Sequence, residues 1–212
     1  MAKQYAQDRK LNPTYIVDGG FWIVLSALAA SRVWFVATEW QLFAGRLVDV
    51  LKIWEGGMSM SGGLVGGMLA TYIYFKRKKV NILEYVDVLA YGLPAGYAVG
   101  RLGCFFIFDH PGVVRDFFLG EVYYLDGLVL HNHWLYLAIT GAVMFAVFTY
   151  LRFKAKPKPP YFLTIFLLWY GTTRLVLDNL RINDSECYGL TAAQWLGFVL
   201  IVAGLIIFGT RQ

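Results

Sequence analysis

The chain has 212 residues, of which 58% are hydrophobic and only 16% are charged, and its mean hydropathy is +0.53. Soluble domains carry roughly a quarter of their residues as charges, so this composition excludes an ordinary soluble globular protein. Basic residues outnumber acidic ones by 19 to 14, but the clusters KRKK (76–79) and RFKAKPK (152–158) directly follow apolar runs, where cytoplasmic topology signals lie. This placement argues against a nucleic-acid-binding surface and favours a polytopic membrane protein.

Six apolar stretches have about the 20 residues that a helix needs to cross a bilayer. They are predicted at 19–37, 59–75, 83–103, 133–151, 161–180 and 189–209. No cleavage site follows the first stretch, which is therefore expected to stay as an anchor. Placing both termini in the cytoplasm puts the basic clusters inside. The predicted fold is all-α, a single membrane domain (1–212) of about six transmembrane helices, with loops 39–58, 104–132 and 181–188 facing outward.

The glycine-rich stretch WEGGMSMSGGLVGGM (54–68) leads into the second span. Small residues four positions apart, such as Gly62 and Gly66, let two helices approach closely, which is a purely structural interpretation. The functional interpretation starts from the flexible GGMSMSGG segment, because polar backbone at membrane depth has to be buried in protein or line a wet cavity. Both interpretations stay open at this point.

Charged residues gather at the outer ends of two spans. In YGTTRLVLDNLR (170–181), Arg174, Asp178 and Arg181 share one helix face. Arg101, in GRLGCFFIFDHPG (100–112), lies at the outer end of the third span, where the topology lets it approach them. Converging guanidiniums with one carboxylate between them form a site for an anion such as a lipid phosphate. The alternatives are a buried ion network that holds the helices together, and for Arg101 a side chain that snorkels to the headgroups.

The motifs GGMSMSGGLVGG, GRLGCFFIFDHPG, HNHWLY and YGTTRLVLDNLR, in this order, resemble the prolipoprotein diacylglyceryl transferase family. The resemblance implies a multi-pass enzyme of the bacterial cytoplasmic (inner) membrane with its active site toward the outer face. Such an enzyme transfers diacylglyceryl from phosphatidylglycerol to the lipobox cysteine of a prolipoprotein and releases glycerol-1-phosphate, with no cofactor or metal. The family has seven spans, so the first of them is expected to be missing here.

The resemblance also assigns site residues. Arg101 and Arg174 match arginines of the family and are expected to bind the lipid phosphate and stabilise the departing charge. Cys104 stands where the family has asparagine, and Ser61 where it has histidine. The resemblance places the following residues at substrate-binding positions: Arg101, Asp109, Gly112, Arg174, Asp178, Arg181, Gly62, Gly63, Ser61 and Cys104.

The base that accepts the thiol proton has to come from elsewhere, because the hydroxyl of Ser61 has no useful proton affinity at neutral pH. His131 is the expected base, and His110 and Asp109 are further candidates on the outer side.

Other possibilities stay open. A catalytically silent paralogue that binds anionic lipid or a lipoprotein signal segment would carry the same arginines, whereas a small transporter finds no support in an internal repeat. Cys104 and Cys187, both at outward loop ends, are a potential disulfide if their Cα atoms lie within about 7 Å.

Overall fold

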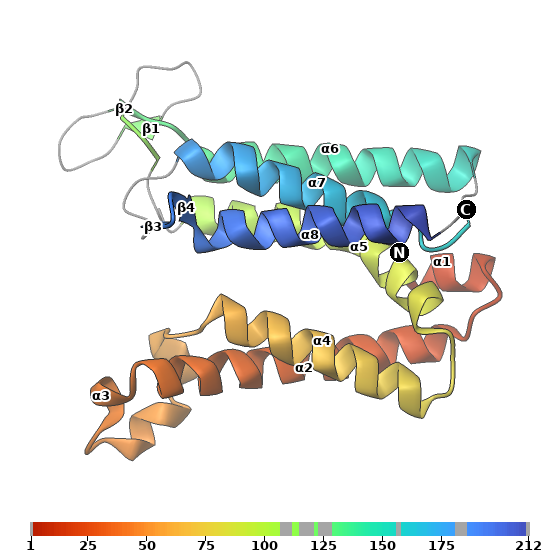
Figure 1. Cartoon of the computed structure of the whole chain (residues 1–212). Coiled ribbons are helices and arrows are strands. Elements are labelled where there is room, and N and C mark those ends of the chain that lie inside the picture. The colour runs from red at the N-terminus through yellow and green to blue at the C-terminus, as the bar shows by residue number, and fades with distance from the viewer. Residues whose placement is uncertain are drawn as a thin grey trace. The chain divides into compact units, whose positions relative to one another are not determined.

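The computed structural model describes residues 2–106, 112–114, 121–122, 129–155, 158–180 and 186–210. Within them, six long helices cover the six predicted spans (Figure 1): α2 (Pro13–Thr38), α4 (Met60–Arg77), α5 (Ile82–Phe106), α6 (His133–Lys154), α7 (Tyr161–Leu177) and α8 (Ala192–Gly209). The all-α fold class is therefore confirmed.

The remaining elements are short. They are the helices α1 (Ala2–Asp8) and α3 (Trp40–Phe43), the 3₁₀ helices η1 (Leu47–Leu51), η2 (Ile53–Glu55) and η3 (Asp178–Leu180), and four strands. The strands pair as two antiparallel ribbons, β1 (Glu121–Val122) with β2 (Val129–Leu130) and β3 (Glu186–Cys187) with β4 (Leu190–Thr191).

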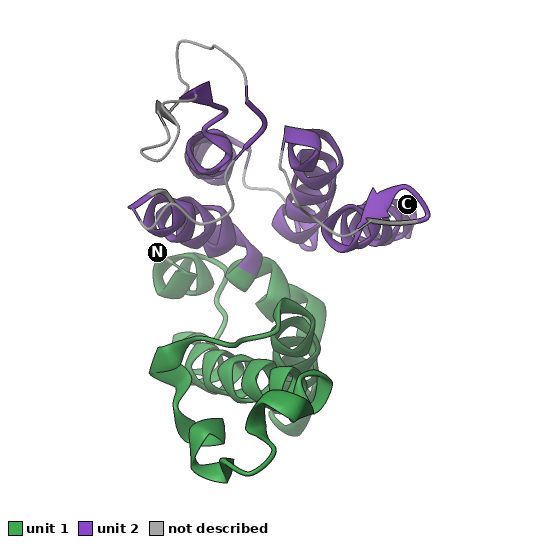
Figure 2. Ribbon diagram, turned by 90° about the vertical axis from the view of Figure 1, so that its left-hand side faces the viewer, with its two compact units in different colours: residues 1–89 green, residues 90–212 purple. Residues whose placement is uncertain are grey.

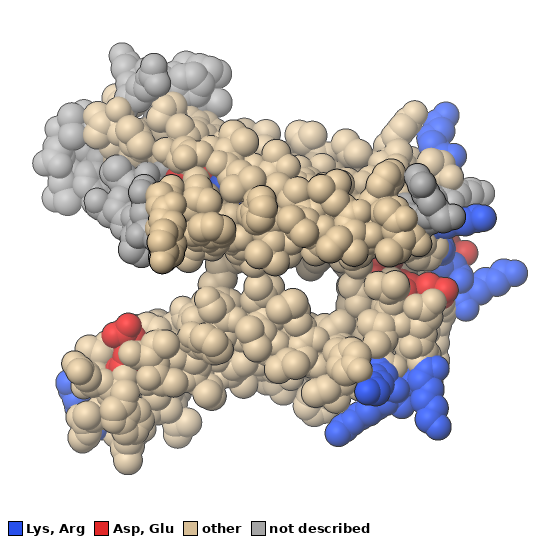
Figure 3. Space-filling model, viewed as in Figure 1, with Lys and Arg blue, Asp and Glu red and all other residues tan. Residues whose placement is uncertain are grey.

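The long helices have the character of membrane spans. Among the described residues, α2, α6 and α8 are long and apolar enough by length and composition to cross a bilayer. The basic residues at the helix ends include Lys76 and Arg77 on α4 and Lys154 on α6. Within each unit, Figure 3 shows uncharged residues over the long middle of the helices. The protein is thus a membrane protein, while the side of the membrane that each end faces stays a prediction.

The chain forms two compact units, residues 1–89 and 90–212 (Figure 2). Helix α5 contributes its first two turns to the first unit and the rest to the second. That the two units form a single membrane domain stays a prediction.

In the first unit, α2 and α4 pack closely through glycine. A Cβ atom on Gly62 would come within 2.6 Å of the Ala30 carbonyl oxygen, and one on Gly66 within 2.9 Å of the Ser26 carbonyl oxygen. The corresponding distance for Gly67, to the Ala27 Cβ, is an ordinary 3.6 Å. The packing interpretation of the glycine-rich stretch therefore holds for Gly62 and Gly66.

The region before the first predicted span is also helical. Residues 2–8 form helix α1, in which Tyr5 and Ala6 are buried. Helix α2 then begins at Pro13, six residues before the predicted span, because the Asn12 side chain accepts a hydrogen bond from the Thr14 amide and proline suits the first helical position. A hydropathy window detects only the apolar part of such a helix.

In the second unit, α5, α6, α7 and α8 lie alongside one another, and the two ribbons lie at the same end of them (Figure 1). Aromatic rings pack α5, α6 and α7 together, with Phe162 at 4.8 Å from Phe148 and 5.4 Å from Tyr91 between ring centroids. Helices α7 and α8 touch at Gly171 and Gly197. The turn into α8 is fixed by a capping box between Thr191 and Gln194. The capping box lies at the end of the unit that carries Arg174 and Asp178, and the aromatic contacts lie nearer the other end.

The contact between α2 and α4 gives a stability prediction. Replacing Gly66 with alanine forces a methyl group against the Ala30 Cβ atom and the Ser26 carbonyl group, and overpacking of this kind costs about 1–3 kcal/mol. Replacing Gly67 with alanine adds no clash and improves helix propensity by up to about 1 kcal/mol. We expect thermal melting in detergent to show Gly66→Ala below wild type and Gly67→Ala at or above it. Equal melting temperatures for the two variants would contradict the close contact.

Candidate functional site

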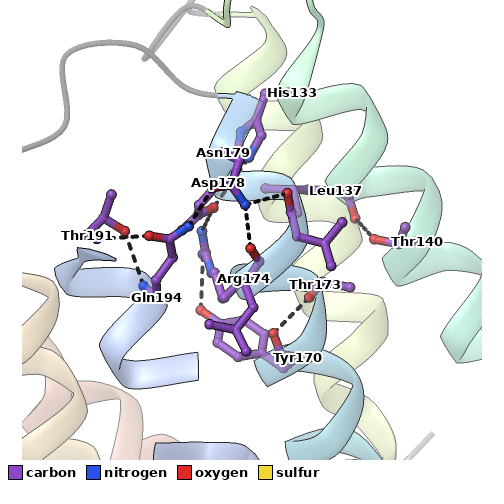
Figure 4. Close-up of polar contacts among 12 residues, drawn as sticks. His133, Leu137, Thr140, Tyr170, Thr173, Arg174, Asp178, Asn179, Thr191 and Gln194 are labelled. Carbon is purple, nitrogen blue, oxygen red and sulfur yellow. Dashed lines mark hydrogen bonds and ion pairs between the residues drawn. The ribbon is translucent and has the colours of Figure 1, made fainter. Parts of the chain in front are cut away.

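A buried ion pair lies at the end of α7. Arg174 is only 2% exposed, and its Nη1 donates to the Asp178 carboxylate at 3.1 Å. Its Nη2 donates to the Tyr170 hydroxyl at 3.0 Å, and its guanidinium lies 5.1 Å from that ring's centroid. Figure 4 shows these side chains converging between the helices. The predicted pairing of Arg174 with Asp178 is confirmed, and Arg181 lies outside the described residues.

His133 joins this cluster from the start of α6. It is 1% exposed, and its Nε2 lies 3.4 Å from the same Asp178 oxygen that Arg174 contacts. The predicted bases are His131, His110 and Asp109, and His133 is not among them. The tract HNHWLY does contain the signal, since Asn132 caps α6 through the Leu135 amide and so sets His133 at the first helical position.

Asn179 and Gln194 fix the segment that carries Asp178. Asn179 donates to the Leu175 carbonyl at 2.6 Å and accepts from Gln194 Nε2 at 3.2 Å. Gln194 belongs to the capping box of α8, so the 3₁₀ turn η3 is tied to the neighbouring helix. Side chains held by such hydrogen bonds keep a defined rotamer, which preorganises the cluster.

Arg101 approaches the cluster through a pair of tyrosines. Its guanidinium lies 5.1 Å from the centroid of the Tyr97 ring, one turn earlier on α5. The Tyr97 ring meets the Tyr170 ring edge to face at 5.4 Å, and Tyr170 bonds Arg174. Arg101 is half-buried, and among the described residues it has no carboxylate partner. The two predicted arginines therefore flank one aromatic pair, and Asp178 neutralises only one of them.

His131 and Gly112 lie beside each other in the segment between α5 and α6. A Cβ atom on Gly112 would collide with the carbonyl oxygen of His131, so this position has no room for a side chain. The Val113 amide donates to the Leu180 carbonyl at 2.9 Å, which connects this strand-like segment to η3. His131 Nδ1 lies 3.0 Å from the Tyr136 hydroxyl, which orients the ring. The roles of Gly112 in binding and His131 in catalysis stay predictions.

Three further residues of the predicted site are Cys104, Asp109 and His110, and the structure describes only the first of them. Cys104 lies in the last turn of α5 and is a free cysteine, so the structure lacks the disulfide with Cys187 that the sequence allows. Asp109 and His110 lie outside the described residues.

Ser61, Gly62 and Gly63 belong to the amino-terminal unit. Ser61 is exposed in the first turn of α4, which Ser59 caps, and Gly62 is buried against α2. Their part in substrate binding stays a prediction.

Arg32 is a structural arginine that the sequence analysis did not single out. It is 7% exposed, and its donors reach five backbone carbonyls of the loop between α2 and α4 at 2.6–3.3 Å, those of Asp49, Val50, Lys52, Gly56 and Gly57. A guanidinium has five N–H donors, so this one is fully used by protein. Gly56 and Gly57 adopt the positive φ values of 87° and 76° that bring their carbonyls to it.

The same loop carries a partly exposed ion pair. Lys52 Nζ lies 2.7 Å from Asp49, and this hydrogen bond holds the pKa of the Asp49 carboxyl below its usual value. The loop thus combines one buried arginine with surface charges.

The fold and the site define a polytopic helical membrane protein with a buried cluster of arginine, carboxylate and histidine at one end of its carboxyl-terminal unit. A sequence model of prolipoprotein diacylglyceryl transferase matches residues 1–210, and the chain belongs to this family.

Curated relatives agree. A protein of Synechococcus elongatus is 27% identical over all of this chain and 79% of its own length. One of Streptococcus pneumoniae (strain Hungary19A-6) is 29% identical over 95% of this chain and 80% of its own. One of Streptococcus suis (strain 05ZYH33) is 29% identical over 89% and 73%, respectively. Each is named phosphatidylglycerol–prolipoprotein diacylglyceryl transferase.

The Arg174–Asp178 pair yields a prediction on stability. Replacing Asp178 with asparagine leaves the buried Arg174 charge without its carboxylate, and breaking a buried pair in this way costs about 3–5 kcal/mol. We expect a clearly lower melting temperature in lipid-free detergent. The double variant Arg174→Met with Asp178→Leu removes both charges and should recover most of the loss. Wild-type melting of Asp178→Asn would show that the pair is not a buried ion pair.

The Arg32 contacts yield a prediction on loop order. Lysine at position 32 offers three donors and so leaves at least two of the five carbonyls unpartnered. We expect trypsin to cleave the Arg32→Lys variant after Arg46 and Lys52 roughly tenfold faster, since each lost hydrogen bond is worth about 0.5–1.5 kcal/mol. Cleavage after Lys79, at the other end of α4, serves as the internal control. An unchanged ratio of the two cleavage rates would contradict the structural role of Arg32.

Proposed function

We propose that this protein transfers the diacylglyceryl group of phosphatidylglycerol to the cysteine thiol of a prolipoprotein, at the outer face of the bacterial cytoplasmic membrane. Family membership and the names of the relatives support this reaction. The observation that carries the site assignment is the placement of Arg101 and Arg174 on either side of the Tyr97–Tyr170 pair. Among the described residues, Asp178 is the one carboxylate that pairs with either arginine.

In the proposed reaction the cysteine sulfur bonds to C3 of the glyceryl group while the C3–O bond to the phosphate breaks. The electron pair of that bond leaves with glycerol-1-phosphate, so negative charge grows on the phosphate. Arg101 and Arg174 offer planar donors for this charge in a site that is already organised by neighbouring side chains. Asp178 balances the charge of Arg174 when the site is empty and leaves an excess of positive charge for the lipid.

The thiol proton needs an acceptor, because a cysteine of ordinary pKa near 8.5 is mostly protonated at neutral pH. His131, held by the Tyr136 hydroxyl, is the proposed base. His133 is a second candidate because its contact with Asp178 resembles the carboxylate–imidazole pairs that orient catalytic histidines.

The transfer reaction is tested directly with purified protein, phosphatidylglycerol and a lipobox peptide, with the thioether product detected by mass spectrometry. We expect product with wild type and a fall of about 10²–10³ in kcat for Arg101→Gln, which removes one preorganised donor. Arg46→Gln, at an exposed loop arginine, should match wild type. Absence of product with wild type, alongside product from a relative, would favour the silent paralogue.

The two histidines are separated by substitution with asparagine. Loss of the base should lower kcat by about 10²–10⁴ and remove the histidine limb of the pH–rate profile. We expect His131→Asn to show this, and His133→Asn to lower mainly the melting temperature through its contact with Asp178. The reverse pattern would assign the base to His133.

A further inference from the structure

The hydroxyl of Tyr97 is a buried polar group whose proton has no acceptor among the described residues. Among the described residues, Tyr97 and Tyr74 are the two tyrosines whose hydroxyl oxygens are enclosed without a hydrogen-bond partner. A buried hydroxyl left unpaired costs free energy, and such groups call for an explanation such as a ligand. Tyr74 lies near the carboxyl-terminal end of α4 in the other unit, whereas Tyr97 lies next to the proposed lipid site.

The surroundings of Tyr97 are aromatic. Its ring meets Trp169 at 5.6 Å and Tyr170 at 5.4 Å, both edge to face, and the Arg101 guanidinium lies over it at 5.1 Å. These contacts fix the ring on three sides. The hydroxyl therefore has a defined position beside both arginines, although no side chain or backbone group in the described part of the chain accepts its proton.

The position of Tyr97 along α5 indicates whether its hydroxyl would reach the phosphate or an ester carbonyl of a bound lipid. Tyr97 precedes Arg101 by one turn of α5, a rise of about 6 Å. If the phosphate is held by Arg101 and Arg174, as proposed above, the acyl chains run along α5 toward its amino-terminal end, and the ester carbonyls lie on the Tyr97 side of the phosphate. The arginines already supply charged donors to the phosphate, whereas a neutral carbonyl suits the aromatic surroundings of Tyr97.

We propose that the Tyr97 hydroxyl donates a hydrogen bond to an ester carbonyl of the glyceryl group, and that it thereby selects diacyl ester lipids over ether lipids. This inference rests on the proposed function, since it places the lipid phosphate between the two arginines. Tyr97 is then a substrate-binding residue that acts one turn deeper than the phosphate site.

The test compares diacyl phosphatidylglycerol with its dialkyl ether analogue, which lacks the ester carbonyls, in wild type and in Tyr97→Phe. Phenylalanine keeps the ring contacts and removes only the hydroxyl. We expect the diacyl-to-dialkyl ratio of kcat/KM to fall by about 2–12-fold in the variant, the equivalent of one neutral hydrogen bond. The comparison is a double-mutant cycle in which one change is made in the protein and the other in the lipid. The ratio of the two kcat/KM values measured with one enzyme preparation does not depend on the fraction of active enzyme in it.

Tyr74→Phe is the matched control, because it also removes an enclosed hydroxyl without a partner. Its lipid ratio should equal that of wild type, and neither variant should melt below wild type, since each loses an unpaired buried group. An unchanged ratio in Tyr97→Phe would overturn the inference, and so would an equal loss on both lipids, which would assign the hydroxyl to the phosphate. Wild type that fails on diacyl lipid would instead overturn the proposed function.

Discussion

The organisation of the carboxyl-terminal unit depends on one constraint, the compensation of a guanidinium that is almost completely buried. Arg174 is almost fully shielded from water and takes its partners from Asp178 and Tyr170. Asp178 in turn needs a defined position, which η3 obtains from Asn179 and from the capping residue Gln194 on α8. The ends of α6, α7 and α8 are therefore fixed together because a charge lies between them, and the site inherits its rigidity from this arrangement.

The arginines of this protein have two different roles. The roles differ in whether the N–H donors of the guanidinium all have partners within the protein. Arg32 gives all its donors to backbone carbonyls of one loop, so it is a structural residue with nothing left for a ligand. Arg174 keeps its Nε without a hydrogen-bond partner among the described residues, and Arg101 has only a ring beneath it. An anionic lipid with ester groups would supply acceptors for the free guanidinium N–H groups and for the tyrosine hydroxyl beside them.

Much of this was predictable from the sequence, for identifiable reasons. Spans follow from local hydropathy, and the Arg174–Asp178 contact follows from helical spacing, so both were found. Arg32 was missed because its five acceptors lie 17–25 residues further along the chain and converge only through two glycines of positive φ. His133 and Tyr97 were missed because their significance depends on which helices pack together. No local sequence pattern predicts that the imidazole of His133 on α6 contacts the carboxylate of Asp178 on η3.

Arg101 and Arg174 are proposed to hold the phosphate of the lipid substrate jointly. An experimental structure with bound phosphatidylglycerol would measure these contacts. We expect a phosphate oxygen within hydrogen-bond distance, about 2.7–2.9 Å, of both guanidiniums, with the Arg174–Asp178 contact preserved. A phosphate bound elsewhere, with both guanidiniums still without a ligand, would contradict this proposal.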